Sequence, residues 1–359
     1  MLRPFSTQLE YIPKCQMLLE SSQNQYAQFM AASSLTKLIT AHWSKFTVAQ
    51  RIEIRHYCLN YLGNNGPGLM AGGSSFVVAA VIQLLCRITK LGWFDDDVIK
   101  NLAQDVKAMI FDFNSLPHMI LGLKVRRQSA AALPPTAASS RHVNFVSAAL
   151  PRLWRRIISP CRNSDPPPKP LCFLAPLNPA PQLLHGLVDE MNKPIKERSL
   201  TVHRKTAISF RDASLLFIFQ VALTCTQQAN SGQLPFPDES TGQKLKTNAL
   251  EVAHAALCFD FVGTCPDESS EEQNIVQIPA SWRNIIQDPA TLQVFLQMYM
   301  QSKPPNSHQA MECLVQLTSI RRTMFGSEED RKKYLGALLA SIVHVLSSKA
   351  GLDREENYH

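Results

Sequence analysis

Apolar residues along this chain recur at intervals of three and four, the spacing that places them on one face of an α-helix. The pattern predicts helices over residues 24–40, 47–62, 74–91, 98–110, 210–229, 244–261, 288–300, 308–320 and 329–346. No stretch alternates apolar and polar residues for long enough to predict a β-strand. The sequence therefore predicts an all-α protein.

The predicted helices carry two apolar stripes where a simple bundle would need one. In residues 47–62, Val48, Ile52 and Leu59 lie on one side and Ile54 and Cys58 on another. Two stripes suit a helix that packs on a hairpin partner and on a neighbouring repeat. Together with helix pairs every 40 to 50 residues, they predict an α-α superhelix of HEAT- or armadillo-like helical hairpins.

The ends of several helices also follow from the sequence. Thr47 can accept a hydrogen bond from a free backbone N–H and so begin the helix over 47–62, and Gly63 is expected to end it. In the helix over 329–346, Leu335, Leu339 and Ile342 belong to a continuous apolar stripe on one face.

Residues 113–184 differ in composition from everything around them. They hold 12 of the 23 prolines, with nine Lys or Arg against one acid. Proline removes a backbone donor and clashes with the preceding turn of a helix, so we expect a disordered, basic insert. A short basic helix that binds a partner is the alternative. The predicted organisation is N-terminal repeats over 1–112, the insert over 113–184, and further repeats over 185–359.

The overall charge of +7 suggests a nucleic-acid partner only until its location is considered. The insert alone carries +8, so the remainder is close to neutral, and we expect no direct binding of nucleic acid. The longest apolar runs fall short of the roughly 20 residues that span a bilayer, and we expect no membrane insertion. Nine widely spaced cysteines, such as Cys86, Cys258 and Cys313, predict reduced, buried thiols in the cytosol or nucleus.

The segment CRITKLGWFDDD contains three consecutive aspartates that could indicate a metal or acid–base site. Successive helical residues point about 100° apart, so Asp95, Asp96 and Asp97 do not converge on one ion. We interpret Asp95 or Asp96 as the cap of the helix that follows. Trp93 and Phe94 are expected to fill the space between the two helices.

Other candidate chemistry is sparse. His254, Cys258 and Cys265 come nearest to metal-ligand spacing, but they lack the Cys-x-x-Cys clip of closed zinc sites, and core packing is the favoured interpretation. No nucleophile elbow, phosphate-binding loop or zinc-protease motif is present. We therefore expect no enzyme activity, no cofactor and no metal. Ser269 and Ser270, in an acidic loop, are candidates for phosphorylation, against a plain solvated loop.

Several stretches resemble a known family of proteins. QRIEIRHYCLNYL, LLCRITKLGWF, HRKTAISFRDASLLFIF, LCFDFVG and VQIPASWRNII occur in the order in which the exportin-7 family has them. This family belongs to the importin-β superfamily of nuclear transport receptors. The resemblance implies a HEAT-repeat superhelix without enzyme activity. It also implies binding of Ran in its GTP form, of protein cargo and of nucleoporins, and a location in nucleus, cytoplasm and nuclear pore.

The resemblance also suggests which side of the fold contacts Ran. The inner helix of each hairpin would lie over residues 47–62, 95–111, 203–229, 279–301 and 329–348. Family members hold Ran with the inner helices of the early repeats. The candidate Ran-binding residues are therefore Arg51, Arg55, Lys100 and Lys107.

This sequence departs from the family in three places. MLRPFSTQLEYI replaces the opening helix, residues 113–182 replace the apolar first part of an outer helix, and the chain is several times shorter. We therefore expect an N-terminal fragment with an atypical insert, such as altered splicing or a faulty gene model would produce. The alternatives are a helical-repeat scaffold without a role in transport and a non-functional truncated product.

Overall fold

The computed structural model describes residues 8–111, 179–233, 239–261 and 278–348. Within those ranges the chain is helical and has no β-strand, which confirms the predicted all-α fold of HEAT-like hairpins. The chain forms two compact units. In the described ranges, unit 1 covers residues 8–100 and unit 2 covers residues 101–110 and 179–348.

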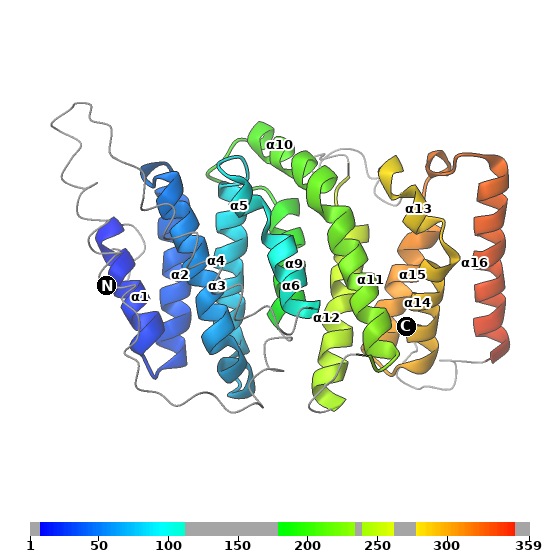
Figure 1. Ribbon diagram of the computed structural model, residues 1–359, viewed down its shortest axis with the longest axis horizontal. Helices are drawn as coiled ribbons and strands as arrows, with labels where there is room; N and C mark the ends of the chain where they lie inside the picture. The colour runs from blue at the N-terminus through cyan, green and yellow to red at the C-terminus, as the bar shows by residue number, and fades with distance from the viewer. Residues whose placement is uncertain (1–7, 112–178, 234–238, 262–277, 349–359) are drawn as a thin grey trace. The chain divides into compact units, whose positions relative to one another are not determined.

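Unit 1 consists of helices in two packed layers (Figure 1). Helices α2 and α4 pack against each other, while α1 packs on α2 and α3 packs on α4. The elements are η2 (Leu9–Tyr11), α1 (Ile12–Ser21), α2 (Gln25–Ala41), η3 (Trp43–Lys45), α3 (Val48–Ala71), α4 (Ser75–Leu91) and α5 (Asp97–Lys100).

The starts of the unit 1 helices are fixed by polar caps. The Asn24 side chain accepts hydrogen bonds from the backbone N–H groups of Tyr26 (2.9 Å) and Ala27 (3.3 Å), which begins α2. Helix α4 is apolar on nearly all sides, as predicted, and its residues from Val77 to Leu91 are mostly buried because α2 and α3 both cover it.

Helix α3 confirms one predicted end and corrects the other. Thr47 caps it as expected, but the helix continues through Gly63 to Ala71 and contains Pro67. A glycine inside a helix costs only about 1 kcal/mol relative to alanine, so it does not by itself end the helix. Pro67 cannot donate to the carbonyl of Gly63, which leaves a weak point in the backbone ladder at this position.

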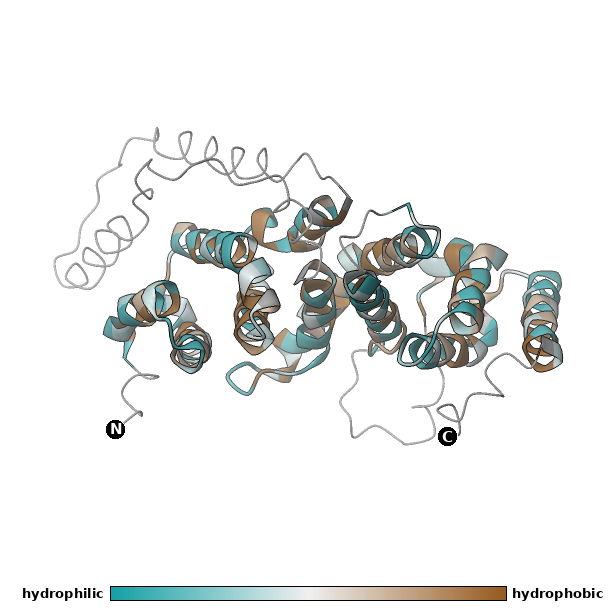
Figure 2. Ribbon diagram, turned by 90° about the horizontal axis from the view of Figure 1, so that it is seen from below, coloured by the Kyte–Doolittle hydropathy of each residue, from teal (hydrophilic) through white to brown (hydrophobic). Residues whose placement is uncertain are grey.

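Unit 2 repeats the two-layer arrangement, and Figure 2 shows its helices close to end-on. Helix α12 packs on α9, α11 and α15, and α14 packs on α15. The elements are α6 (Leu102–Phe111), α9 (Pro179–Asn192), α10 (Leu200–Phe210), η5 (Arg211–Leu215), α11 (Leu216–Asn230), α12 (Glu239–Leu257), η6 (Ala280–Trp282), α13 (Arg283–Ile286), α14 (Pro289–Gln301), α15 (Asn306–Thr318), η7 (Arg322–Met324) and α16 (Glu328–Ser348).

A chain of aromatic rings forms the centre of unit 2. The ring of Trp282 lies 5.2 Å from that of Phe219 and 5.6 Å from that of Phe261, measured between centroids. The π-helical turn η5 begins beside this cluster, and there Arg211 donates to the carbonyl of Phe261 (Nη1 to O, 2.6 Å). Arg211 thus ties the irregular turn between α10 and α11 to the chain that follows α12.

The run Leu200–Asn230 through α10, η5 and α11 is continuous and, by length and composition alone, could cross a membrane. It is longer than the apolar run seen in the sequence, because polar residues of α10 extend it. In the structure α11 packs closely on α12, and Ile218 and Phe219 are fully buried. Core helices of folded domains pass the same length test.

The apolar stripe of α16 is exposed. Leu339 is 62% exposed, and Leu335, Ile342, Val343 and Leu346 are also largely open. Only Tyr334 and Leu338 among its large apolar side chains are buried. The periodic pattern identified an apolar face, but no helix in the described residues covers it.

The predicted insert lies mostly outside the described residues, since 112–178 are not covered. Helix α9 begins at Pro179, so the predicted domain boundary at residue 184 falls inside a helix. Proline is tolerated in a first turn because its missing N–H has no partner there in any case. The disorder and the domain limits assigned to this segment stay predictions.

Candidate functional site

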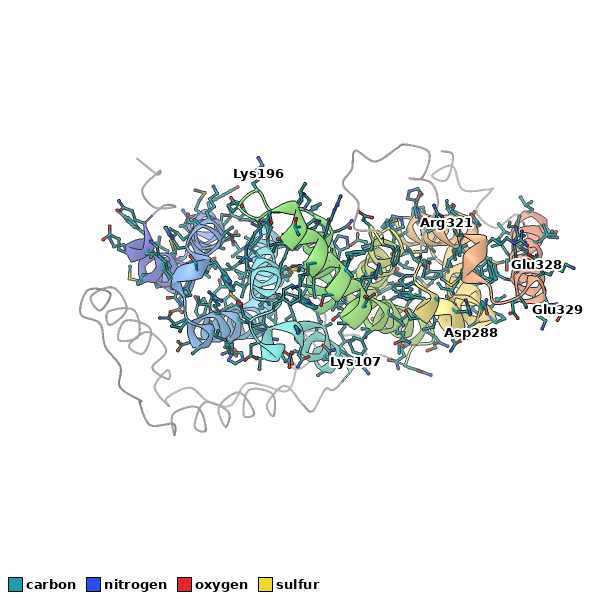
Figure 3. All side chains as sticks on the ribbon, turned by 90° about the horizontal axis from the view of Figure 1, so that it is seen from above. Lys107, Lys196, Asp288, Arg321, Glu328 and Glu329 are labelled. Carbon is teal, nitrogen blue, oxygen red and sulfur yellow. The ribbon has the colours of Figure 1, made fainter. Side chains whose placement is uncertain are left out.

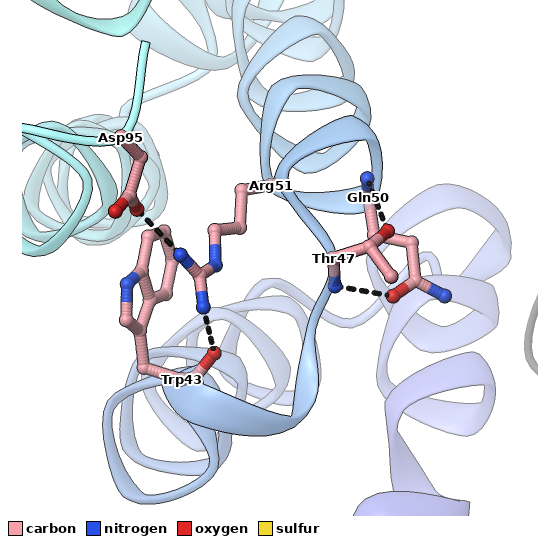
Figure 4. Close-up of polar contacts among 5 residues, drawn as sticks. All are labelled: Trp43, Thr47, Gln50, Arg51 and Asp95. Atoms are coloured by element: carbon pink, nitrogen blue, oxygen red, sulfur yellow. Dashed lines mark hydrogen bonds and ion pairs between the residues drawn. The ribbon is translucent and has the colours of Figure 1, made fainter. Parts of the chain in front are cut away.

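The first turn of α3 is held by a reciprocal pair of hydrogen bonds. The Thr47 hydroxyl accepts from the backbone N–H of Gln50 (3.3 Å), and the Gln50 side-chain oxygen accepts from the backbone N–H of Thr47 (2.9 Å). This capping box satisfies two donors that would otherwise be free at the helix start. It fixes the position of Arg51, one residue further on (Figure 4).

Arg51 joins three segments of unit 1. Its Nη1 lies 2.7 Å from Asp95 Oδ2, and its Nη2 donates to the backbone oxygen of Trp43 at 2.9 Å. The guanidinium carbon lies 4.7 Å from the centroid of the Trp43 ring, within range of a cation–π interaction. Because its side chain is only 13% exposed, Arg51 is a cross-link within the fold (Figure 4).

Gly92 allows the turn after α4 to approach this cluster. A Cβ at Gly92 would lie 2.8 Å from Ile99 Cδ1, 3.0 Å from the Trp43 ring and 3.3 Å from Asp95 Oδ2. The 2.8 Å distance requires Ile99 to shift, and the other two require small adjustments of Trp43 and Asp95, so glycine is the residue that lets this turn approach the Arg51 cluster without strain.

The three aspartates have three different partners. Asp96 Oδ1 accepts from the backbone N–H of Val98 at 2.7 Å, which confirms that it caps the helical turn of α5. Asp95 instead pairs with Arg51, and Asp97 lies 3.3 Å from the Lys100 ammonium. Trp93 is buried as predicted, whereas Phe94 is 50% exposed and does not fill the space between the helices.

Arg55 lies in the interior of unit 1. It follows Arg51 by one turn of α3, and only 1% of its surface is exposed. Its positive charge acts on the neighbouring Cys58 thiol, although burial is the larger influence and raises the pKa of Cys58 to about 12. Neither Arg55 nor Arg51 therefore presents a free cation to a partner.

Lys100 and Lys107 reach the surface. The Lys100 side chain is 34% exposed and pairs with the well-exposed Asp97. Lys107 is exposed on α6 of unit 2, and its ammonium lies 5.3 Å from the centroid of the Phe217 ring (Figure 3). These two belong to separate units, and only they among the four candidates can offer charge to another molecule.

His254 lies in the last turn of α12 and Cys258 directly follows that helix, with Nε2 and Sγ 3.3 Å apart. Cys258 is exposed, which corrects the expectation of a buried thiol, while Cys15, Cys58, Cys86, Cys225 and Cys313 are buried; none of these six cysteines forms a disulfide. Burial, opposed by Glu312, lowers the pKa of His254. Within the described ranges no three His, Cys, Asp or Glu residues are grouped so as to hold a metal ion.

Despite its exposure, Cys258 should react slowly at neutral pH. Partial burial and then the charge of Glu312 raise the pKa of this thiol to about 11. Since the thiolate is the reactive form, modification by an aromatic disulfide reagent should accelerate about tenfold per pH unit from pH 8 to 10. The measurement needs a chain with Cys161, Cys172 and Cys265 changed to serine, and Cys258→Ser as control. A rate that levels off near pH 8.5 would contradict it.

Ser269, Ser270 and Cys265 lie outside the described residues, so phosphorylation at the two serines stays a prediction. The sequence interpretation missed the pairing of Arg51 with Asp95, which are 44 residues apart. A signal was present in the spacing of Thr47 and Gln50, three residues apart before an apolar run, which predicts a fixed first turn for Arg51 but not the distant partner of Arg51.

Comparison with known proteins finds one matching domain and several relatives. Residues 1–64 match the importin-beta N-terminal domain. The chain is 34% identical to exportin-7-B of Xenopus laevis over 360 residues, and 32% identical to both Ran-binding protein 16 of Drosophila melanogaster and Ran-binding protein 17 of Homo sapiens. These matches cover 98–99% of the chain.

The chain is a homologue of exportin-7 and the Ran-binding proteins 16 and 17. It spans about a quarter of the length of these relatives, 26–27% in the three cases. The match extends along nearly the whole chain, and the importin-beta N-terminal domain takes in η2, α1, α2, η3 and the part of α3 up to Asn64. The family resemblance read from the sequence is confirmed.

Proposed function

We propose that this chain is part of a nuclear transport receptor that carries protein cargo between nucleus and cytoplasm and binds Ran in its GTP form. The observation that supports this most strongly is homology along 98–99% of the chain to proteins named exportin-7 and Ran-binding protein. Passage through the nuclear pore with the help of nucleoporins belongs to the same proposal. The role requires a binding surface and no catalytic group.

Lys100 in unit 1 and Lys107 in unit 2 are each, separately, a candidate surface cation for Ran, because both side chains reach solvent. Arg51 and Arg55 have a different role in this proposal: they keep α3 in place from within unit 1. A charge on the rim of an interface mainly changes the association rate and its salt dependence. The two lysines should therefore influence how fast Ran is captured.

Immobilised chain should retain Ran loaded with GTP and not Ran loaded with GDP. Lys100→Glu and Lys107→Glu should each weaken that capture by about three- to tenfold at low salt, and the difference should shrink as salt is added. Lys37→Glu, an exposed lysine of α2, is the matched control and should leave capture unchanged. The measurement is the association rate on a biosensor surface.

Equal retention of both nucleotide forms, or of neither, would overturn the proposal and favour a scaffold without a Ran-dependent role. Nucleotide-selective capture that neither lysine variant changes would instead place the contact elsewhere on the chain.

A further inference from the structure

An open groove of about 660 Å³ runs between α14 and α16 in unit 2. One wall is formed by three glutamines of α14, Gln293, Gln297 and Gln301, with Leu296 and Met300 beside them. The opposite wall presents small side chains of α16, including Ala337 and Ala340. The lining contains no Lys, Arg, Asp or Glu, and His344 of α16 is its one ionisable side chain, so the groove suits an uncharged ligand.

The glutamines offer hydrogen-bonding groups that the fold leaves unused. All three are exposed, and Gln293 and Gln297 make no hydrogen bond within the part of the chain that the structure describes. Gln301 is held in position, since its side-chain oxygen accepts from Asn230 at 3.0 Å. Each free side-chain amide can donate to a carbonyl and accept from an N–H at the same time.

The spacing of this row matches an extended polypeptide. Residues four apart on a helix are separated by about 6 Å along its axis, at about 1.5 Å per residue. Along one edge of an extended strand, N–H and C=O groups recur every two residues, or about 6.6–6.8 Å. Two consecutive glutamine amides can therefore bond to two consecutive backbone sites on one edge of such a strand.

A helical ligand would not use these groups, because a helix bonds its N–H and C=O groups internally. The small side chains on α16 leave room for the ligand's own side chains on the other side of the groove. An extended ligand therefore fits both walls of the groove: its backbone can form hydrogen bonds with the glutamines of α14, and its side chains have room beside the small residues of α16.

We propose that the α14–α16 groove binds a short, extended and uncharged peptide segment of a partner protein through its backbone, with Gln293 and Gln297 as the principal contacts. The side-chain amides of Gln293 and Gln297 bind the backbone of the peptide. Contacts to Leu296, Met300 and Ala340 determine which peptide side chains fit. This inference goes beyond the proposed transport role, because it requires neither Ran nor nucleotide.

The probe is a library of random nine-residue peptides, selected on the full chain. Peptides so obtained should bind the Gln293→Ala/Gln297→Ala double variant about ten- to thirtyfold more weakly, because each lost hydrogen bond contributes modestly and the two add. Ala340→Phe should fill the groove and abolish binding. Gln104→Ala, an exposed glutamine of α6, is the matched control and should bind normally.

Methylation of the peptide backbone gives the sharpest test. Two versions of a selected peptide carry N-methyl groups on odd or on even residues, and only the version that blocks the edge facing α14 should lose binding. Circular dichroism of each protein variant checks that its helices are intact. Failure to select any peptide, equal binding to Ala340→Phe, or equal loss with both methylated versions would overturn the proposal.

Discussion

Trp282→Ala should lower the free energy of unfolding of unit 2 by about 3–5 kcal/mol, the usual cost of removing a large buried aromatic side chain. Trp282 is 1% exposed, and its ring contacts those of Phe219 and Phe261. The variant loses the transfer energy of the indole and the two ring contacts, and leaves a cavity where η6 meets α11. Urea denaturation would measure the change in the free energy of unfolding. Hydrogen exchange of the backbone amides of α11 and α12 would show that the change lies in unit 2.

Two variants control this measurement. Trp282→Phe keeps one ring in the cluster and should cost clearly less than the alanine change. Phe94→Ala removes an aromatic residue that is 50% exposed and should alter stability by no more than about 0.5 kcal/mol. If Trp282→Ala cost less than about 1 kcal/mol, the aromatic cluster would not be the centre of unit 2.

Arg51→Ala should destabilise unit 1 by about 2–4 kcal/mol, because it leaves Asp95 partly buried without its cation and frees the Trp43 carbonyl. Asp95→Ala should cost a similar amount. The double variant should cost less than the sum of the two, with a coupling energy of about 1–2 kcal/mol. Chemical denaturation of the four proteins completes the cycle.

The exposed pair of Lys100 and Asp97 is the matched control, since surface ion pairs contribute about 0–1 kcal/mol. If the losses of unfolding free energy in Arg51→Ala and Asp95→Ala simply added up in the double variant, the cross-link between the two residues would be contradicted. The same proteins separate structure from binding: Ran capture by Arg51→Ala should fall only as the folded fraction falls. A loss of capture in a fully folded Arg51→Ala chain would instead make Arg51 a contact residue.

Much of the fold was accessible from local sequence because helices form from interactions between residues three and four apart. The predicted helix over 74–91 coincides with α4, and Thr47 and Asp96 begin helices at the expected positions. The family was also accessible, since short motifs such as LGWF and SFRD keep their order.

The four Ran-binding candidates stay a prediction, and the structure shows only which of their side chains reach solvent. The four candidate residues were selected because they are cationic and lie on predicted inner helices. Neither criterion shows which residues from distant segments pack against each side chain. Arg51 was found to pair with Asp95, and Arg55 to be enclosed, whereas Lys100 and Lys107 remained open to solvent. A buried charge needs a partner from a distant segment, and local pattern contains no information about that partner.

By itself the sequence determined that this protein is a series of two-sided helices, because apolar spacing and capping residues act over one or two turns, and its motifs showed the resemblance to exportin-7. Only the tertiary structure decided which polar and apolar groups face solvent. It enclosed Arg55, exposed Cys258 and the stripe of α16, and placed a glutamine row beside small residues 40 positions away in sequence. Exposure depends on how helices pack, and packing joins residues that are far apart along the chain.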